Sequence, residues 1–291
     1  MTTPVFRFAP SPNGRLHLGH AHSACLNDDL AARMGGRLLL RIEDLDPVRS
    51  RPDLIAAIEA DLIWLGLRFE RPVLHQSSRI DVYRDVIASL AERGLAYPCF
   101  CSRATMSAAV ETLEARTGRP WPRDPDGVPH YPGSCRDLTN AEIAVRRSAG
   151  ALPLWRLHGE RARAAAPGPH RWTTFDAFGD TGCRIAEPHR WGDVVIGRRD
   201  VPASYHLAVV IDDDAQAVTH VVRGADLLAA TDIHVLLQAL LGLDRPRYHH
   251  HALVRDGKGD KLAKSKGSES LADLRAAGWT ACDVRAQVGF G

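Results

Sequence analysis

The first third of the chain alternates short apolar runs with longer segments in which apolar residues recur at helical spacing. Residues 5–9 and 38–42 are apolar runs suited to strands that are buried on both faces of a sheet. Between them, residues 18–34 have helical character and end at two glycines, and residues 52–65 form a second helical segment. Because strands alternate with helices, this region predicts a parallel α/β sheet.

Similar alternation occurs further along. A third helix is expected after Ser78, its predicted N-cap, with Asp81 three residues later and with apolar residues on one face at Ile80, Tyr83, Ile87 and Leu90. Towards the C-terminus, the pattern predicts a strand at 218–223, a helix at 225–241 and a strand at 248–254.

The middle of the chain is different. Between about residues 97 and 136 cysteines appear, followed by a proline- and glycine-rich stretch, which indicates an insertion rather than another βα unit. Thr139 and Glu142 match a capping box that opens a short helix. Residues 151–200 are richer in turns and β-forming residues.

Composition excludes several classes of protein. The chain has 291 residues, of which 45% are hydrophobic, enough for a sizeable core. With 37 Lys and Arg against 35 Asp and Glu, it is no disordered polyelectrolyte, and nucleic acid would bind through local patches. No stretch approaches the roughly 18 consecutive apolar residues of a membrane helix, and a secretory signal is not expected. Six cysteines are too few for a disulfide scaffold, so a reduced, cytoplasmic setting is expected.

The first candidate for chemistry follows the first predicted strand. His17 and His20 are three residues apart in an H-x-G-H tetrapeptide, so they share one face of a helical start. Gly19 allows a flat ligand to approach the backbone closely, and a helix N-terminus offers N–H groups and partial positive charge to a phosphate. Taken alone, the tetrapeptide fits two surface histidines on an ordinary helix equally well.

The second candidate is a K-x-x-K-S segment. Lys261, Lys264 and Ser265 lie in a glycine-flanked loop that can fold over a triphosphate, although most lysine-rich loops are merely solvated. The H-x-G-H and K-x-x-K-S motifs together indicate a protein family more specifically than either motif alone. An H-x-G-H after the first strand and a K-x-x-K-S near the end of an α/β chain resemble the catalytic domain of class I aminoacyl-tRNA synthetases. The loop departs from the usual K-M-S-K-S of that family at Leu262 and Ala263.

Further segments narrow the resemblance to the glutamyl group of these enzymes. They are residues 7–12 with Gly14, and the stretches 41–46, 205–213 and 221–228. The resemblance implies a set of glutamate-binding residues: Arg7, Phe8, Ala9, Pro10, Ser11, Glu43, Tyr205 and Arg223.

Within that set, the two arginines would bind the carboxylates of glutamate and Glu43 would bind its ammonium group, because a planar guanidinium suits a carboxylate. Each charge-assisted hydrogen bond is worth roughly 1.5–3 kcal/mol, and glutamine would leave part of an arginine unpaired. Without its neighbours, the stretch 41–44 would read as a strand end with surface ion pairs.

The same resemblance implies ATP as co-substrate, together with Mg²⁺ held mainly by phosphates and water. No protein nucleophile is needed, since the α-carboxylate of glutamate attacks the α-phosphorus of ATP. The expected catalytic residues, which stabilise charge on the phosphates, are His17, His20 and Lys264. The expected ATP-binding residues are His17, Gly19, His20, Lys261, Lys264 and Ser265.

The cysteine-containing insertion is a candidate metal site. Three thiolates supply three of the four tetrahedral positions that zinc prefers, although their spacing fits three core thiols equally well. The resemblance implies one structural zinc per chain, with the ligands Cys99, Cys101, Tyr131 and Cys135. His130 stays a rival fourth ligand, because imidazole is the commoner choice. The remaining cysteines are expected to be core thiols: Cys25, Cys183 and Cys282.

The chain ends soon after the lysine segment. This short form with a cysteine insertion resembles the glutamyl-queuosine tRNA(Asp) synthetases over nearly its full length. The resemblance implies an α/β fold, in which a class I, Rossmann-like parallel sheet carries a zinc-containing insertion, with no anticodon-binding domain. It also implies that L-glutamate is activated by ATP and transferred to queuosine in the anticodon loop of tRNA(Asp), by a monomer without a membrane partner.

On this interpretation the chain has four expected parts: 1–96, the first half of a nucleotide-binding catalytic domain; 97–200, an insertion with the zinc site and a β-rich connection; 201–270, the second half of the catalytic domain; and 271–291, a short C-terminal tail. Three alternatives stay open. They are a short glutamyl-tRNA synthetase that charges the tRNA 3′ end, a nucleotidyltransferase that makes a small-molecule product, and a non-catalytic binding relative.

Overall fold

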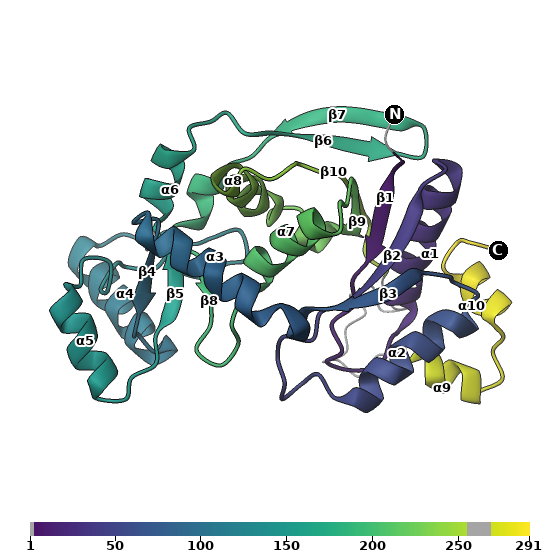
Figure 1. Ribbon diagram of the computed structural model, residues 1–291, viewed down its shortest axis with the longest axis horizontal. Helices are drawn as coiled ribbons and strands as arrows, with labels where there is room; N and C mark the ends of the chain where they lie inside the picture. The colour runs from purple at the N-terminus through teal and green to yellow at the C-terminus, as the bar shows by residue number, and fades with distance from the viewer. Residues whose placement is uncertain (1–2, 255–268) are drawn as a thin grey trace.

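The computed structural model describes residues 3–254 and 269–291 (Figure 1). Its centre is a seven-stranded sheet in the order β3-β2-β1-β9-β10-β6-β7. Neighbouring strands are parallel except for the β6–β7 hairpin at one edge, so the expected α/β fold is confirmed. The strands are β1 Val5–Phe8, β2 Arg37–Ile42, β3 Glu70–His75, β6 Arg171–Asp176, β7 Gly179–Ile185, β9 His220–Gly224 and β10 Arg247–His251.

Helices cover this sheet because their apolar faces need partners. One core cluster joins residues of α3, α7 and α8, and a second joins residues of α1, α2, α9 and α10. Figure 1 shows the second group beside β1–β3, apart from α7 and α8. The helices are α1 Leu18–Arg33, α2 Pro52–Trp64, α3 Ile80–Glu92, α4 Arg103–Thr117, α5 Asn140–Ser148, α6 Gly159–Ala165, α7 Tyr205–Ala215, α8 Thr231–Leu241, α9 Leu271–Ala276 and α10 Ala281–Gln287, with 3₁₀ turns η1 Gln76–Arg79, η2 Pro188–Trp191 and η3 Ala225–Leu227.

A smaller lobe stands at the far end of α3 from the main sheet (Figure 1). It contains an antiparallel sheet in the order β4-β5-β8, formed by Ala96–Cys99, Leu154–Leu157 and Val195–Gly197, with α4 and α5 alongside. Strands β6 and β7 follow β5 in sequence but extend the main sheet. The stretch 97–200 therefore contributes strands to both sheets.

Two of the expected caps had different outcomes. The capping box of Thr139 and Glu142 is present at the start of α5. The prediction of Ser78 as N-cap is wrong: α3 begins at Ile80 directly after the 3₁₀ turn η1, so Ser78 is already inside a helical turn. Its hydroxyl donates to the carbonyl of His75 at 2.7 Å instead.

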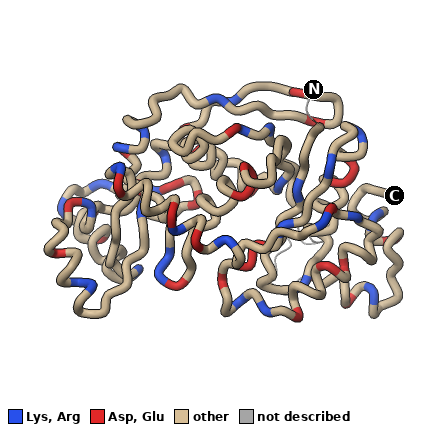
Figure 2. The backbone as a smooth tube through the Cα atoms, viewed as in Figure 1, with Lys and Arg blue, Asp and Glu red and all other residues tan. Residues whose placement is uncertain are grey.

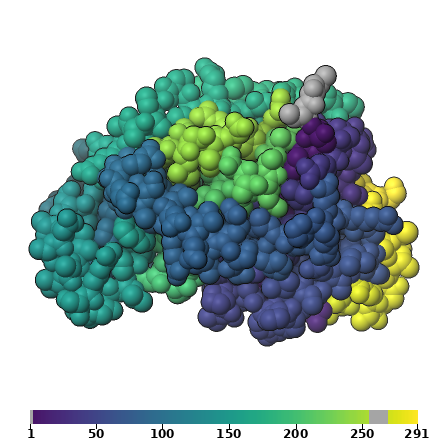
Figure 3. Space-filling view, in the orientation of Figure 1, coloured from purple at the N-terminus to yellow at the C-terminus, as the bar shows by residue number. Residues whose placement is uncertain are grey.

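The C-terminal segment packs against the N-terminal half of the molecule. Leu271, Leu274, Val284 and Val288 are buried in the same core as α1 and α2. In Figure 3 the yellow C-terminal atoms accordingly lie against the purple N-terminal ones. Acidic and basic residues are interspersed over both lobes (Figure 2), in line with a net charge of +2. None of the helices in the described residues combines the length and apolar character needed to cross a membrane.

Candidate active site

A cavity of about 540 Å³ opens at the C-terminal ends of β1 and β9. These strands are neighbours, yet the chain continues from β1 towards β2 and from β9 towards β10, on opposite sides. Ligands of open α/β sheets bind at such a topological switch point. The cavity is lined by these residues singled out in the sequence: Arg7, Phe8, Ala9, Pro10, Ser11, His17, Gly19, His20, Glu43, Tyr205 and Arg223.

The K-x-x-K-S segment cannot be placed in the same way. Lys261, Lys264 and Ser265 lie outside the described residues. The described residues on either side of that stretch are close to the site: Val254 lines the cavity, and Ser270 forms a β-bridge with His17.

The two histidines of the H-x-G-H tetrapeptide form a capping box at the start of α1. The backbone N–H of Gly19 donates to Nδ1 of His17 at 3.1 Å, and the N–H of His17 donates to Nδ1 of His20 at 3.2 Å. A ring nitrogen that accepts a hydrogen bond carries no proton, so in each neutral ring the proton is on Nε2. The arrangement therefore fixes both histidines in the tautomer that can donate from Nε2.

A side chain at residue 19 would crowd this cap. A Cβ added at residue 19 would lie 3.0 Å from Cε1 and 3.1 Å from Nδ1 of the His17 ring. The absent side chain thus makes room for a catalytic candidate as well as for an approaching ligand.

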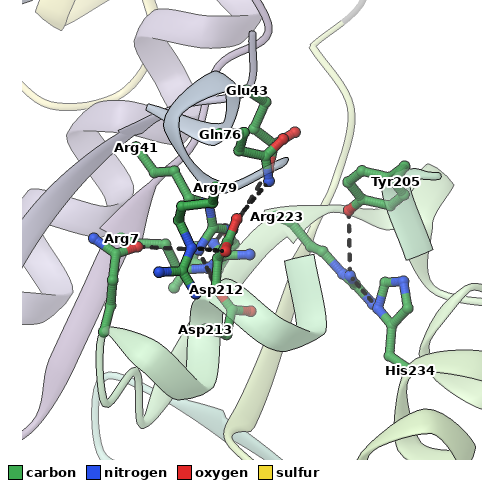
Figure 4. A network of polar contacts seen from close by, with 12 residues as sticks. Arg7, Arg41, Glu43, Gln76, Arg79, Tyr205, Asp212, Asp213, Arg223 and His234 are labelled. Carbon is green, nitrogen blue, oxygen red and sulfur yellow. Dashed lines mark hydrogen bonds and ion pairs between the residues drawn. The ribbon is translucent and has the colours of Figure 1, made fainter. Parts of the chain in front are cut away.

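A network of buried charges adjoins the cavity, which two of its members, Arg7 and Glu43, help to line (Figure 4). Asp213 of α7 accepts from Nε of Arg7 at 3.0 Å and from NH1 of Arg41 at 2.7 Å. Arg41 also lies 3.4 Å from Glu43. Burial would raise the pKa of Asp213, but the charges of Arg7 and Arg41 outweigh it and lower the pKa below the ordinary range. Burial raises the pKa of Glu43, against the opposing charges of the same arginines.

The neighbouring Asp212 anchors α7 to the start of α3. Its carboxylate accepts from Arg79 at 2.7 Å, from Gln76 at 2.8 Å and from the hydroxyl of Tyr83 at 2.8 Å. Because α7 also begins at Tyr205, this anchor holds one wall of the cavity.

Arg223, at the end of β9, is only 5% exposed, and its guanidinium is directed towards Tyr205 and His234, away from Asp213 (Figure 4). Its guanidinium donates to Tyr205, His234, Thr231 and His250, at distances of 2.7–3.4 Å. Among the residues that the structure describes, no carboxylate forms an ion pair with it.

Several residues of this site escaped the sequence analysis. Asp213 and Arg41 fall in stretches noted for their resemblance, but no role was expected for either. Of the partners of Arg223, Tyr205 was expected in the site, but no role was expected for Thr231, His234 or His250. Asn13, Ser23 and Asp226 also line the cavity.

A second candidate site lies in the smaller lobe. The Sγ atoms of Cys99, Cys101 and Cys135 all lie within 4.8 Å of one another, and those of Cys101 and Cys135 are 3.6 Å apart. A tetrahedral zinc ion about 2.3 Å from each sulfur separates the sulfurs by about 3.8 Å, so the cluster fits such an ion. The hydroxyl of Tyr131 is 3.3 Å from Sγ of Cys101. His130 instead donates from Nε2 to the backbone carbonyl oxygen of Arg190, at 2.8 Å.

Two arginines lie beside this cysteine cluster. The guanidinium of Arg156 lies over the Tyr131 ring, 4.0 Å from its centroid. Arg199 donates to the carbonyls of Phe100 and Cys101 and so ties the cluster to the segment after β8. Of the other cysteines, Cys25 is buried as expected, whereas Cys183 and Cys282 are exposed, so the prediction of core thiols was wrong for those two.

Comparisons with known proteins agree with this geometry. The family model for tRNA synthetases class I (E and Q), catalytic domain, matches residues 5–283. The chain is 45% identical to the glutamyl-Q tRNA(Asp) synthetase of Rhodobacter capsulatus, over 98% of this chain and 100% of that protein. It is 36% identical to the glutamate–tRNA ligase of Prochlorococcus marinus, over 94% of this chain but 55% of that protein. The glutamate-tRNA synthetase of Elizabethkingia anophelis has a similar structure, with a TM-score of 0.71 at 26% identity, covering 91% of this chain and 53% of that one.

Proposed function

The chain belongs to the class I (E and Q) tRNA synthetase family, in the group of the glutamyl-Q tRNA(Asp) synthetases, and we propose that it transfers ATP-activated L-glutamate to queuosine in the anticodon loop of tRNA(Asp). The observation that carries this proposal is the similarity to the Rhodobacter capsulatus protein, which extends over the whole of that protein. The glutamate–tRNA ligases are less similar, and the chain spans about half of their length. The natural setting is the cytoplasm, where ATP, glutamate and tRNA are available.

We propose that the first step joins glutamate to AMP. The α-carboxylate of glutamate attacks the α-phosphorus of ATP, and pyrophosphate leaves. Arg7 and Arg223 hold the substrate carboxylates and Glu43 holds the ammonium group, which places the nucleophile beside the nucleotide. The Nε2–H groups of His17 and His20 face charge that develops on the phosphates, and Lys264 is proposed to act on the same charge. Mg²⁺ supplies further neutralisation of the phosphates when it is bound with ATP.

In the second step a hydroxyl of the queuosine cyclopentene ring attacks the activated carbonyl, and AMP leaves. The anticodon arm is bound largely through its phosphates, so affinity falls as salt concentration rises. The cavity residues Phe8, Ala9, Pro10 and Ser11 form the glutamate side of the site, and Gly19 the nucleotide side, where Lys261 and Ser265 are also proposed to bind ATP.

The cysteine cluster is proposed to hold one structural zinc ion through Cys99, Cys101, Cys135 and Tyr131. A bound zinc cross-links β4 to the loop that precedes α5. It lies in the smaller lobe, so its expected contribution is to folding of that lobe rather than to chemistry.

The decisive experiment compares two tRNA preparations. Labelled glutamate and ATP are incubated with the purified protein and with tRNA from cells that either make queuosine or lack it. Label is expected only on queuosine-containing tRNA(Asp), and glutamate-dependent ATP–pyrophosphate exchange is expected in the absence of any tRNA. Equal labelling of both preparations would instead support a short glutamyl-tRNA synthetase that charges the 3′ end. Exchange that does not depend on glutamate would support a nucleotidyltransferase.

A further inference from the structure

We infer that Thr231, His234 and His250 are specificity-determining positioning residues, which surround Arg223 with neutral hydrogen-bond acceptors and so reserve its charge for a substrate carboxylate. The inference rests on the proposed glutamate site. It adds a reason why that site selects an anionic substrate, and it assigns this selection to residues that do not line the cavity.

The geometry around Arg223 begins with three elements that converge on one guanidinium. Nε donates to Nε2 of His250 on β10 at 3.1 Å, and NH2 donates to Oγ1 of Thr231, the first residue of α8, at 2.7 Å. NH1 donates to Nδ1 of His234, one turn further along α8, at 3.0 Å, and makes a longer contact of 3.4 Å with the hydroxyl of Tyr205. Four acceptors from three elements therefore fix the plane of the guanidinium.

The direction of these hydrogen bonds shows that both histidines are neutral. A guanidinium can only donate, so the ring nitrogens that face it, Nδ1 of His234 and Nε2 of His250, must be unprotonated. Nε2 of His234 then carries its proton and donates to Nδ1 of His206, 3.2 Å away. Burial, assisted by the charge of Arg223, lowers the pKa of His206 to about 4 and that of His250 to about 3, so the rings stay neutral at physiological pH.

The other buried charges of the cavity balance each other. Arg7 and Arg41 share Asp213, and Arg41 also faces Glu43, so that two cations lie among two carboxylates. Within the described part of the chain, Arg223 has only neutral partners, and it is 5% exposed. The group as a whole therefore carries one uncompensated positive charge, on Arg223.

This charge matches one class of substrate. Free glutamate carries a net charge of −1, whereas glutamine is neutral and similar in shape. A resident carboxylate beside Arg223 would satisfy the guanidinium and remove the advantage of the acidic substrate. Neutral acceptors orient the guanidinium equally well and leave its charge unneutralised, and in a buried site an unneutralised charge interacts strongly with a ligand.

The test changes charge at constant shape. In His234→Asn, the amide oxygen can occupy the place of Nδ1 and accept from Arg223; in His234→Asp, a carboxylate of the same size does so. Glutamate- and glutamine-dependent ATP–pyrophosphate exchange is measured for both variants and for the unchanged protein. The Asp variant is expected to raise KM for glutamate about 10- to 100-fold, the scale of one charge-assisted hydrogen bond, with little change in kcat, in KM for ATP or in the response to glutamine. The Asn variant is expected to keep the ratio of glutamate to glutamine efficiency within a few-fold.

If the Asn and Asp variants had the same ratio of glutamate to glutamine efficiency, the inference would be overturned. A purely structural role of His234 predicts this equal ratio, because both substitutions would then disturb the site alike. Because His234 is fully enclosed, a second matched pair at the more accessible His250, changed to Gln and to Glu, applies the same comparison if the first Asp variant does not fold. Failure of the proposed function gives a different result: the unchanged protein would then show no glutamate-dependent exchange, and Arg223 would select some other anion. Thermal-shift titration of the unchanged protein and both His234 variants with a panel of carboxylic acids would then apply the same charge comparison.

Discussion

Asp213 is the point at which the structure makes its sharpest prediction about stability. One of its carboxylate oxygens accepts from both Arg7 and Arg41, and all three side chains are buried. The change Asp213→Asn keeps the shape of the side chain but removes the charge that both arginines face. Removing one partner from a buried ion pair costs about 3–5 kcal/mol, because the remaining charge is left uncompensated away from water.

The expected loss corresponds to a fall in Tm of about 6–10 °C, at roughly 2 °C per kcal/mol for a chain of this size. The matched control is Asp180→Asn, the same chemical change in an ion pair with Arg247 whose side chains are 50% and 47% exposed. A surface pair contributes about 0–1 kcal/mol, so the control is expected to lower Tm by about 2 °C or less. Thermal unfolding followed by circular dichroism measures both. Equal shifts in the two variants would refute the buried-charge account.

The pH dependence supplies a second check on the same residue. The pKa of Asp213 is lowered in the folded protein, so its contribution is fully present above its unfolded pKa of about 3.9 and is lost as the pH falls through the lower folded value. The stability difference between the unchanged protein and Asp213→Asn should therefore be constant at neutral pH and shrink in strong acid. If the stability difference between the two proteins grew as the pH fell, Asp213 could not be the buried, ionised partner of the two arginines.

Three further changes test the rest of the molecule. Cys135→Ser is expected to reduce bound zinc from one per chain to a small fraction by elemental analysis, whereas Cys282→Ser, at an exposed thiol, should leave it unchanged; equal zinc in both would remove the cluster as a metal site. Glu43→Gln should raise KM for glutamate about tenfold or more. Burial raises the pKa of Glu43, so this side chain should become protonated at a pH above the ordinary pKa of a glutamate side chain. Binding of the substrate glutamate by the unchanged protein should weaken as the pH falls through that value. The Glu43→Gln variant should lack this pH-dependent loss of binding. Gly19→Ala should reduce ATP–pyrophosphate exchange at least tenfold, since the new Cβ would lie 3.0 Å from the neighbouring histidine ring, while Gly182→Ala on strand β7 should not; similar activity in both would show that the ring tolerates the methyl group.

Local patterns in the sequence predicted the elements that carry their own signal. Three of the four residues of the strand at 5–8 are apolar or aromatic, the exception being Arg7. All four residues are buried in the structure. The H-x-G-H spacing predicted two histidines close together at the start of a helix; in the structure His17 is the N-cap of α1, and its ring centroid lies 3.9 Å from that of His20. The Ser78 cap failed because the residues before the helix already form a 3₁₀ turn, a preference that a four-residue motif does not reveal.

Long-range pairing could not be predicted in the same way. Arg7 and Asp213 are separated by 206 positions, and nothing in either neighbourhood specifies the other. Thr231, His234 and His250 were missed as partners of Arg223 for the same reason, since a histidine in an apolar helix reads as a core residue until its acceptor role is seen. The cavity residues came from family resemblance rather than from periodicity, and the sheet then showed why they meet: the ends of two neighbouring parallel strands lie side by side.

The packing of α9 and α10 against α1 and α2 has a consequence for biosynthesis. The segment with His17 and His20 at the start of α1 leaves the ribosome well before part of the apolar surface that covers this helix, around Leu271 and Val284. Until those residues emerge, the underside of that helix is incompletely covered and its hydrophobic side chains are open to other nascent chains. The part of the cavity lined by His17 and His20 can therefore be completed only after residues 271–288 have emerged, even though its sequence motif is translated earlier.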